Sequence, residues 1–134
     1  ELHPYLSQKK MVKLSKSYGL EISGFSPLGA KSYVELEMAG IHQDLVHHDL
    51  IQHLSCYYSK SATQILLRWA IERGTIPICK SSSLQHMKDN INIFDFSISE
   101  IDMNRLDKLN INLRFNDPGK FCLDAFGTFC PIYD

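Results

Sequence analysis

The segment ICKSSSLQHMKDN, residues 78–90, holds the residues with the clearest chemical potential in this sequence. Lys80 is followed by three serines, where a short apolar run gives way to a polar, helix-forming pattern. The first turn of a helix presents free N–H groups and the positive end of the helix dipole, which favours a phosphate group. A lysine and several hydroxyls beside that turn would complete an anion site. The same residues also suit a serine N-cap beside a surface lysine.

The elements that would position this segment alternate between helix and strand. Apolar residues recur at helical spacing or in short runs, separated by glycine and proline. We expect an irregular loop over residues 30–43, long enough to favour a functional role, and an irregular tail after Asn110. Helices are expected over residues 8–18, 48–58 and 84–91. Two more helices are expected to begin at serine caps, one from Ser61 to Arg73 and one after Ser99. A strand is expected over residues 20–25 and a short buried strand over residues 75–79.

This alternation predicts the fold class. Strands separated by helices form βαβ units and a parallel sheet, so we expect an α/β protein. Only two strands are complete, with a strand end at residues 1–3. A parallel sheet needs several strands and a covering layer on both faces. The chain is therefore expected to be part of a larger structural unit.

The overall composition narrows the class of protein. The 134 residues are 44% hydrophobic and 22% charged, with a formal net charge of −1, as in an ordinary soluble domain. We expect no nucleic-acid partner, because there is no excess of basic residues. We expect no membrane partner, because no apolar run approaches the roughly 20 residues of a membrane helix. The first residues, ELHPYLSQ, lack the features of a signal peptide.

The cysteines and histidines favour neither a disulfide framework nor a metal site. Cysteines stand at positions 56, 79, 122 and 130, without a CxxC motif. This pattern favours reduced thiols in a cytoplasmic protein, with Cys122–Cys130 the one conceivable disulfide. His48 and His53 are five residues apart, so they do not share a helical face as metal ligands at i and i+4 would. We therefore expect no metal.

Three long segments follow one another along the chain: ELHPYLSQKKMVKLSKSYGLEISGFSPLG, SATQILLRWAIERGTIPICKS and KSSSLQHMKDNINIFDFSIS. In this order they resemble parts of the aldo-keto reductase family: the region between the sixth and seventh strands, the seventh helix with the eighth strand, and the final cofactor-binding segment. GAKSYVELE and LRFNDP are especially similar to the xylose (aldose) reductase branch. The resemblance covers essentially the whole chain and weakens over residues 39–46 and after residue 118.

The resemblance implies a fold, and it implies that the catalytic residues lie outside this chain. The family forms a (β/α)8 TIM barrel with NADPH at the C-terminal face of its strands, and such barrels need about 250 residues. Residues 1–134 would be the C-terminal portion of that domain, from the end of strand six through strand eight, the final helices and the C-terminal loop. The N-terminal barrel half would be absent. Because the family's catalytic Asp, Tyr, Lys and His lie in the earlier strands, no catalytic residue is expected here.

The resemblance gives the serine-rich segment a specific role in cofactor binding. The family residues that match Lys80 and Ser81 hold the 2′-phosphate of NADPH, and Ser82 belongs to the same turn. His86 stands where the family often has an arginine that stacks on adenine and pairs with the phosphate. A histidine can also stack, but it is mostly uncharged at neutral pH. NADP(H) is therefore the expected cofactor, with NAD(H) as the alternative.

Three further positions match family contacts to the cofactor. Asn90 matches an asparagine that binds adenine, with Asp89 beside it, although both would also suit the exposed face of a helix. Glu35 matches a glutamate on the adenosine ribose, a role that carboxylates have in other dinucleotide folds. It would equally be a solvated loop residue. Phe25 stands where the family stacks a tyrosine on the nicotinamide, and a phenyl ring stacks as well. Periodicity alone favours a core aromatic there.

The last matches concern the pyrophosphate and the substrate. The loop that crosses the pyrophosphate corresponds to Ser26, Leu28, Lys31 and Ser32. Asn116, in LRFNDP, matches an asparagine near the substrate's sugar hydroxyls, and an amide can both donate to and accept from a polyol. A turn asparagine before Asp-Pro would explain the same residue.

Two classes of function remain open. In the first, the chain is part of an NAD(P)H-dependent reductase that transfers hydride to the carbonyl of an aldose or small aldehyde, so the isolated chain would be inactive. In the second, it is a non-catalytic nucleotide-binding or assembly fragment that pairs with the missing barrel half or a second chain, because an open sheet edge favours a partner.

Overall fold

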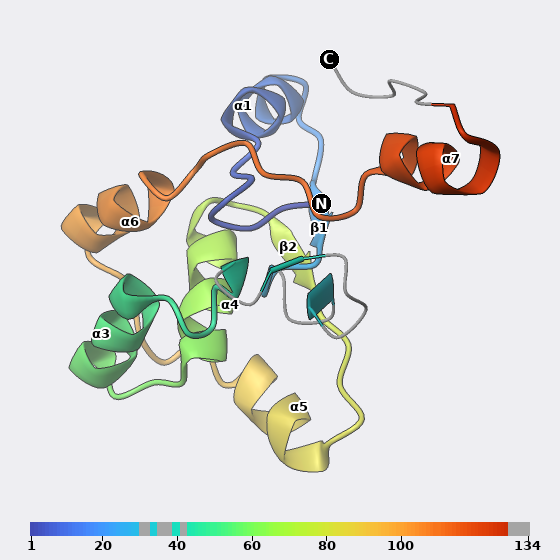
Figure 1. The fold of residues 1–134 in the computed structure, drawn as a ribbon. Coiled ribbons are helices and arrows are strands. Elements are labelled where there is room, and N and C mark those ends of the chain that lie inside the picture. The colour runs from blue at the N-terminus through green and yellow to red at the C-terminus, as the bar shows by residue number, and fades with distance from the viewer. Residues whose placement is uncertain (30–32, 35–38, 41–42, 129–134) are drawn as a thin grey trace.

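The computed structural model describes residues 1–29, 33–34, 39–40 and 43–128. Helices and strands alternate along the chain as the sequence predicted (Figure 1). No helix among the described residues is long and apolar enough to cross a membrane. The elements are α1 (Lys9–Ser17), β1 (Ser23–Phe25), α3 (Asp49–Tyr58), α4 (Ala62–Glu72), β2 (Ile76–Ile78), α5 (Leu84–Ile91), α6 (Glu100–Asp107) and α7 (Pro118–Phe126).

The two strands form a parallel pair, which confirms the predicted sheet type. Ser23 pairs with Ile76, and Phe25 pairs with Ile78. The N-terminal segment lies against the end of β1, where the N–H of Leu2 donates to the carbonyl of Phe25 at 3.1 Å. A Cβ added at Gly24 would lie 2.9 Å from the Leu2 Cβ. Glycine therefore allows the close approach of these two backbones.

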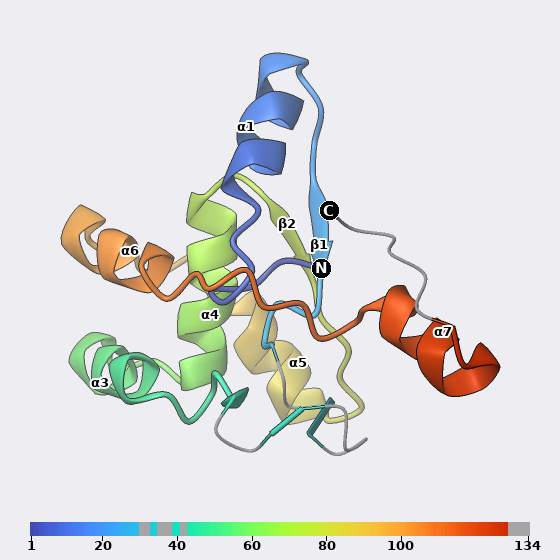
Figure 2. The same ribbon diagram turned by 45° about the horizontal axis from the view of Figure 1, so that its top comes forward.

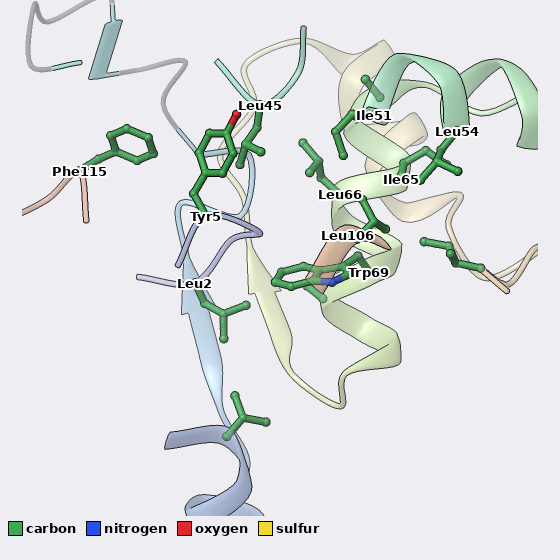
Figure 3. Close-up of a cluster of buried hydrophobic side chains, with 14 of the residues drawn as sticks. Leu2, Tyr5, Leu45, Ile51, Leu54, Ile65, Leu66, Trp69, Leu106 and Phe115 are labelled. Atoms are coloured by element: carbon green, nitrogen blue, oxygen red, sulfur yellow. The ribbon is translucent and has the colours of Figure 1, made fainter. Parts of the chain in front are cut away.

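The core lies around α4. In both views this helix stands between the sheet on one side and α3 with α6 on the other (Figures 1 and 2). Ile65, Leu66 and Trp69 are 0% exposed. Side chains from the N-terminal segment, α3, α6 and Phe115 converge on the same cluster (Figure 3). The predicted apolar stripe of this helix is thus the centre of the fold.

Helix ends follow local capping rules. Ser61 and Gln64 form a capping box at the start of α4: the Ser61 hydroxyl accepts from the backbone N–H of Gln64, and the Gln64 side-chain oxygen accepts from the backbone N–H of Ser61. Ser99 accepts from the backbone N–H of Asp102 at the start of α6. At its other end α4 stops at Arg73, and Gly74 follows with a φ of +70°. The sequence predicted these three boundaries correctly.

Three expectations were wrong. The strand over residues 20–25 is formed only at Ser23–Phe25. The strand over residues 75–79 was expected to be buried, yet Ile76 and Ile78 are 45% and 54% exposed. Only one face of the sheet is covered by α4, so these side chains on the other face stay accessible. The tail is not irregular throughout, because α7 forms after Asp117, whose side chain accepts from the N–H of Gly119.

Candidate functional site

A pocket of about 500 Å³ lies where the carboxyl ends of β1 and β2 meet the first turn of α5. The carboxyl edge of a parallel sheet, beside a helix N-terminus, is a common place for a ligand. The lining residues are Ser26, Pro27, Leu28, Gly29, Thr63, Ile78, Cys79, Lys80, Ser81, Ser82, His86, Asp89 and Asn90.

The structure brings most of the predicted cofactor residues to this one pocket. Phe25 lies directly before it at the end of β1, 44% exposed, and does not line it. Lys31, Ser32 and Glu35 lie outside the described residues. The eight of the twelve predicted residues that do line it are Ser26, Leu28, Lys80, Ser81, Ser82, His86, Asp89 and Asn90.

The serines after β2 divide between holding the turn and facing the pocket. Ser83 is the N-cap of α5, and its Oγ accepts from the N–H of His86 at 3.4 Å. The Ser81 hydroxyl is used within the turn, because it accepts from the Ser83 N–H and donates to the Ser83 carbonyl, both at 3.2 Å. The exposed Ser82 makes no side-chain hydrogen bond to any described residue. Its hydroxyl is therefore available to a ligand.

Lys80 is the cation of the pocket. It is exposed, and it forms no ion pair or side-chain hydrogen bond with the described part of the chain. By contrast, Lys9 is paired with Asp107 at 3.1 Å, and Lys60 is paired with Asp95. An ammonium group without a protein partner, next to a helix N-terminus, provides two attractions for the same anion.

The two polar residues on α5 have one side already engaged. The Asp89 carboxylate accepts from Gln85 Nε2 at 2.9 Å. Asn90 Nδ2 contacts Cys79 Sγ at 3.5 Å, which turns this side chain toward the end of β2. The Asn90 amide oxygen makes no hydrogen bond within the described residues, so it remains an acceptor at the pocket wall.

The loop after β1 forms the opposite wall through a strained turn. Ser26 has a φ of +52°, and its carbonyl accepts from the N–H of Gly29 at 2.9 Å. Its hydroxyl lies 2.9 Å from the Tyr33 hydroxyl, so this turn is tied to the loop that follows. Gly29 is required twice over: its φ is +69°, and an added Cβ would come within 2.6 Å of Leu45 Cδ1.

The lining of the pocket combines polar groups with an apolar surface. One end offers an ammonium, a hydroxyl and a helix N-terminus, while Pro27, Leu28 and Ile78 give an apolar surface for a planar group. No cluster of three potential metal ligands occurs among residues 1–29, 33–34, 39–40 and 43–128. His48, considered above as a metal ligand, caps α3, and the neighbouring His47 contacts Asp44.

Comparison with known proteins now decides the family. Residues 1–111 match the Aldo/keto reductase family. This chain is an aldo/keto reductase family member. It is similar to 4-dihydromethyl-trisporate dehydrogenase of Mucor mucedo, 37% identical over 135 residues that cover 100% of this chain and 40% of that protein. It is also similar to NAD(P)H-dependent D-xylose reductase I,II of Candida tropicalis, 38% identical over 120 residues, covering 88% and 37%.

A solved aldo/keto reductase has the same arrangement of elements. The crystal structure of the Brucella melitensis protein matches with a TM-score of 0.69 and 30% identity, covering 82% of this chain and 37% of that one. The predicted fold class is therefore confirmed: the chain has the α/β fold of part of an aldo/keto reductase TIM barrel. It spans about 40% of the length of the curated relatives it matches.

Two residues of this aldo/keto reductase site were missed. Thr63 lines the pocket from the first turn of α4, and no local pattern distinguishes it from a surface threonine. Gln64 holds α5 in place, because its Nε2 donates to the carbonyls of Asp89 at 3.1 Å and Asn92 at 2.9 Å. The capping box with Ser61 was detectable from the S-x-x-Q spacing. The tether to α5 was not, because it joins segments 25 and 28 residues apart.

The predicted substrate residue lies in a different environment. Asn116 precedes α7, does not line the pocket, and donates its backbone N–H to Glu1 Oε2 at 2.9 Å. At the end of α7, Phe126 is 80% exposed. Phe129 and Tyr133 lie outside the described residues.

Proposed function

We propose that this chain is the C-terminal portion of an NAD(P)H-dependent aldo-keto reductase and that its pocket binds the adenosine and 2′-phosphate end of NADP(H). The observation that carries the proposal is that eight of the residues that the resemblance matches to the cofactor site line one pocket. The groups present fit a phosphate: Lys80 and the Ser82 hydroxyl have no described protein partner, and both line the pocket beside the first turn of α5.

Each wall of the pocket has a part in this proposal. Lys80 and Ser82 would hold the 2′-phosphate, with His86 beside them in the first turn of α5. Asn90 would accept from the adenine amino group through its free amide oxygen. Leu28 and the turn at Ser26 would cover the pyrophosphate, together with Lys31 and Ser32. Phe25, exposed at the end of β1, would stack on the nicotinamide.

In the whole protein, bound NADPH would supply the hydride for reduction of an aldose or small aldehyde carbonyl to an alcohol. The catalytic Asp, Tyr, Lys and His would be contributed by a barrel half outside residues 1–134. The present chain would orient the cofactor, and Asn116 would contribute to the sugar site. We propose a cytoplasmic location on the grounds of cysteine usage, since Cys56, Cys79 and Cys122 form no disulfide with any described residue.

Titration of NADPH fluorescence with the chain tests this function. Lys80→Met should weaken NADPH binding about tenfold, because a hydrogen bond to a charged group contributes about 1.5 kcal/mol or more. Lys88→Met is the matched control, since Lys88 is a nearby exposed lysine, on α5, that does not line the pocket. Equal affinity in the two variants, or no fluorescence change with the unmodified chain, would contradict the proposed function.

A second candidate is a non-catalytic assembly fragment, and one observation favours it. Phe25, Ile76 and Ile78 are all more than 40% exposed on the sheet face that α4 does not cover. Ile76 also lines an apolar groove of about 480 Å³, together with Met87, Ile91 and other residues. Surfaces of this kind usually have a protein partner. If Ile76→Glu, at a residue that does not line the cofactor pocket, abolishes association with a separately expressed barrel half but leaves NADPH affinity unchanged, the chain has both roles.

A further inference from the structure

Residues 1–7 and 110–116 lie side by side and are joined by a ladder of hydrogen bonds (Figures 1 and 2). The Tyr5 carbonyl accepts from the N–H groups of Ile111 and Leu113 at 3.2 and 3.0 Å. The Ser7 N–H donates to Asn110 Oδ1 at 2.8 Å. The family match ends at residue 111, so the C-terminal half of this ladder lies beyond it.

Glu1 ends the ladder with a side chain instead of a backbone group. Its Oε1 accepts from the N–H of Phe115 at 3.0 Å, and its Oε2 accepts from the N–H of Asn116 at 2.9 Å. His3 Nε2 lies 2.8 Å from Oε1, and both side chains are 0% exposed. A buried carboxylate is costly unless donors surround it. Here three donors hold it, and in return it fixes two successive residues of the distant segment.

The ring of Phe115 connects the Glu1 contacts to a residue near the pocket. Its centroid lies 5.1 Å from the His3 ring and 5.7 Å from the Tyr33 ring, which stacks on it at 18°. Figure 3 shows Phe115 reaching the buried cluster from the C-terminal segment. The Tyr33 hydroxyl then meets the Ser26 hydroxyl at 2.9 Å, and Ser26 lines the pocket. Each contact in this series joins residues that are buried or half-buried.

We propose that Glu1 is a positioning residue for the pocket: its carboxylate holds Phe115, Phe115 supports Tyr33, and Tyr33 keeps the Ser26 turn in its strained conformation. The effect on NADPH binding rests on the proposed function, whereas the effect on the turn does not. Ser26 has a φ of +52°, a conformation that non-glycine residues hold only where the surroundings impose it. Loss of the restraint at Glu1 should therefore loosen this turn.

Amide hydrogen exchange on the full chain tests the positioning without any ligand. Glu1→Gln keeps the shape of the side chain but places an NH2 group against a backbone N–H. Exchange at Phe115 and Asn116 should accelerate about tenfold or more, because a hydrogen bond to a charged group is lost. Exchange at Gly29, whose N–H closes the Ser26 turn, should accelerate severalfold. Unchanged exchange at Gly29 would overturn the proposal.

Matched variants separate this path from general destabilisation. Glu21→Gln removes the same charge from an exposed position and should leave exchange at Phe115 and Gly29 unchanged. Amides within α4, such as that of Trp69, should exchange at the unmodified rate in Glu1→Gln. Equal acceleration at Trp69 and Gly29 would indicate global loosening and would refute a specific role for Glu1.

A double-mutant cycle on NADPH affinity adds the functional readout. Glu1→Gln should weaken NADPH binding about fivefold in the unmodified chain, but less than about twofold when Tyr33→Phe has already removed the hydroxyl that reaches Ser26. Equal effects in both backgrounds would refute the path through Tyr33. If the unmodified chain binds no NADPH, the proposed function fails, and exchange at Gly29 alone decides whether Glu1 positions the turn.

Discussion

His86 offers the sharpest prediction about cofactor choice. It is the third residue of α5, its side chain is exposed, and it lines the pocket on the same side as Lys80. His86→Arg would place a permanent cation and a planar donor group beside the proposed 2′-phosphate. NADPH and NADH differ only in that phosphate, so the substitution should act on one cofactor and spare the other.

His86→Arg should change two quantities, the affinity for NADPH and the stability of α5. A charge-assisted hydrogen bond to phosphate contributes about 1.5–3 kcal/mol, and the lower figure applies because the pocket is open to solvent. This corresponds to about a tenfold gain in NADPH affinity. A cation in the first turn of α5 opposes the helix dipole and costs about 0.3–1 kcal/mol of stability. We therefore expect tighter NADPH binding with a slightly lower melting temperature, and a change in NADH affinity of less than about twofold.

Fluorescence titration of both cofactors at two salt concentrations measures this effect. Leu84→Arg is the control, because it adds the same charge to the first turn of α5 at an exposed residue that does not line the pocket. The gain in NADPH affinity should shrink at high salt. Equal gains for NADH and NADPH, or an equal gain from Leu84→Arg, would refute a phosphate contact at His86.

Further predictions concern the support of the pocket and the effect of acid. Gln64→Ala should lower the free energy of unfolding in urea by about 1–3 kcal/mol and speed amide exchange in α5, because the buried amide joins α4 to the end of α5. The control is Gln52→Ala on the exposed face of α3, which should lower the free energy of unfolding by less than half as much. Burial raises the pKa of the Glu1 carboxyl, but the hydrogen bonds it accepts outweigh burial and hold that pKa below its ordinary value. The stability that this group supplies should therefore be complete at about pH 6 and be lost as the pH falls through the lowered pKa, and urea unfolding of Glu1→Gln should show a flatter profile over the same range.

Local rules predicted the helix boundaries well and the environment of the strands poorly. Ser61 and Ser99 were recognisable because capping depends on residues three positions apart. The exposure of Ile76 and Ile78 was not, because apolar character does not reveal which elements cover a strand. The helix after Asp117 was missed since Asp-Pro serves equally as a turn and as an N-cap with proline at N1.

The candidate site was predicted in its residues but not in its internal arrangement. The resemblance pointed to Lys80 and Ser81 together as phosphate ligands. The structure shows that the Ser81 hydroxyl forms its hydrogen bonds within the turn, whereas the Ser82 hydroxyl has no partner in the described chain. The Glu1 contacts span 114 and 115 residues, a separation at which no local pattern gives a signal. Long-range polar contacts of this kind follow from topology rather than from periodicity.

The central claim is that the pocket beside α5 binds the phosphate end of NADP(H). The most direct measurement maps backbone amide chemical shifts of the ¹⁵N-labelled chain with NADPH and then with NADH. Binding at this pocket should shift the amide signals of Gly29 and of residues 80–90 with both cofactors, and the differences between the two cofactors should be confined to residues 80–86. Shifts confined to the polar groove formed by residues 6–11 and 110–117, or identical maps for the two cofactors, would contradict it.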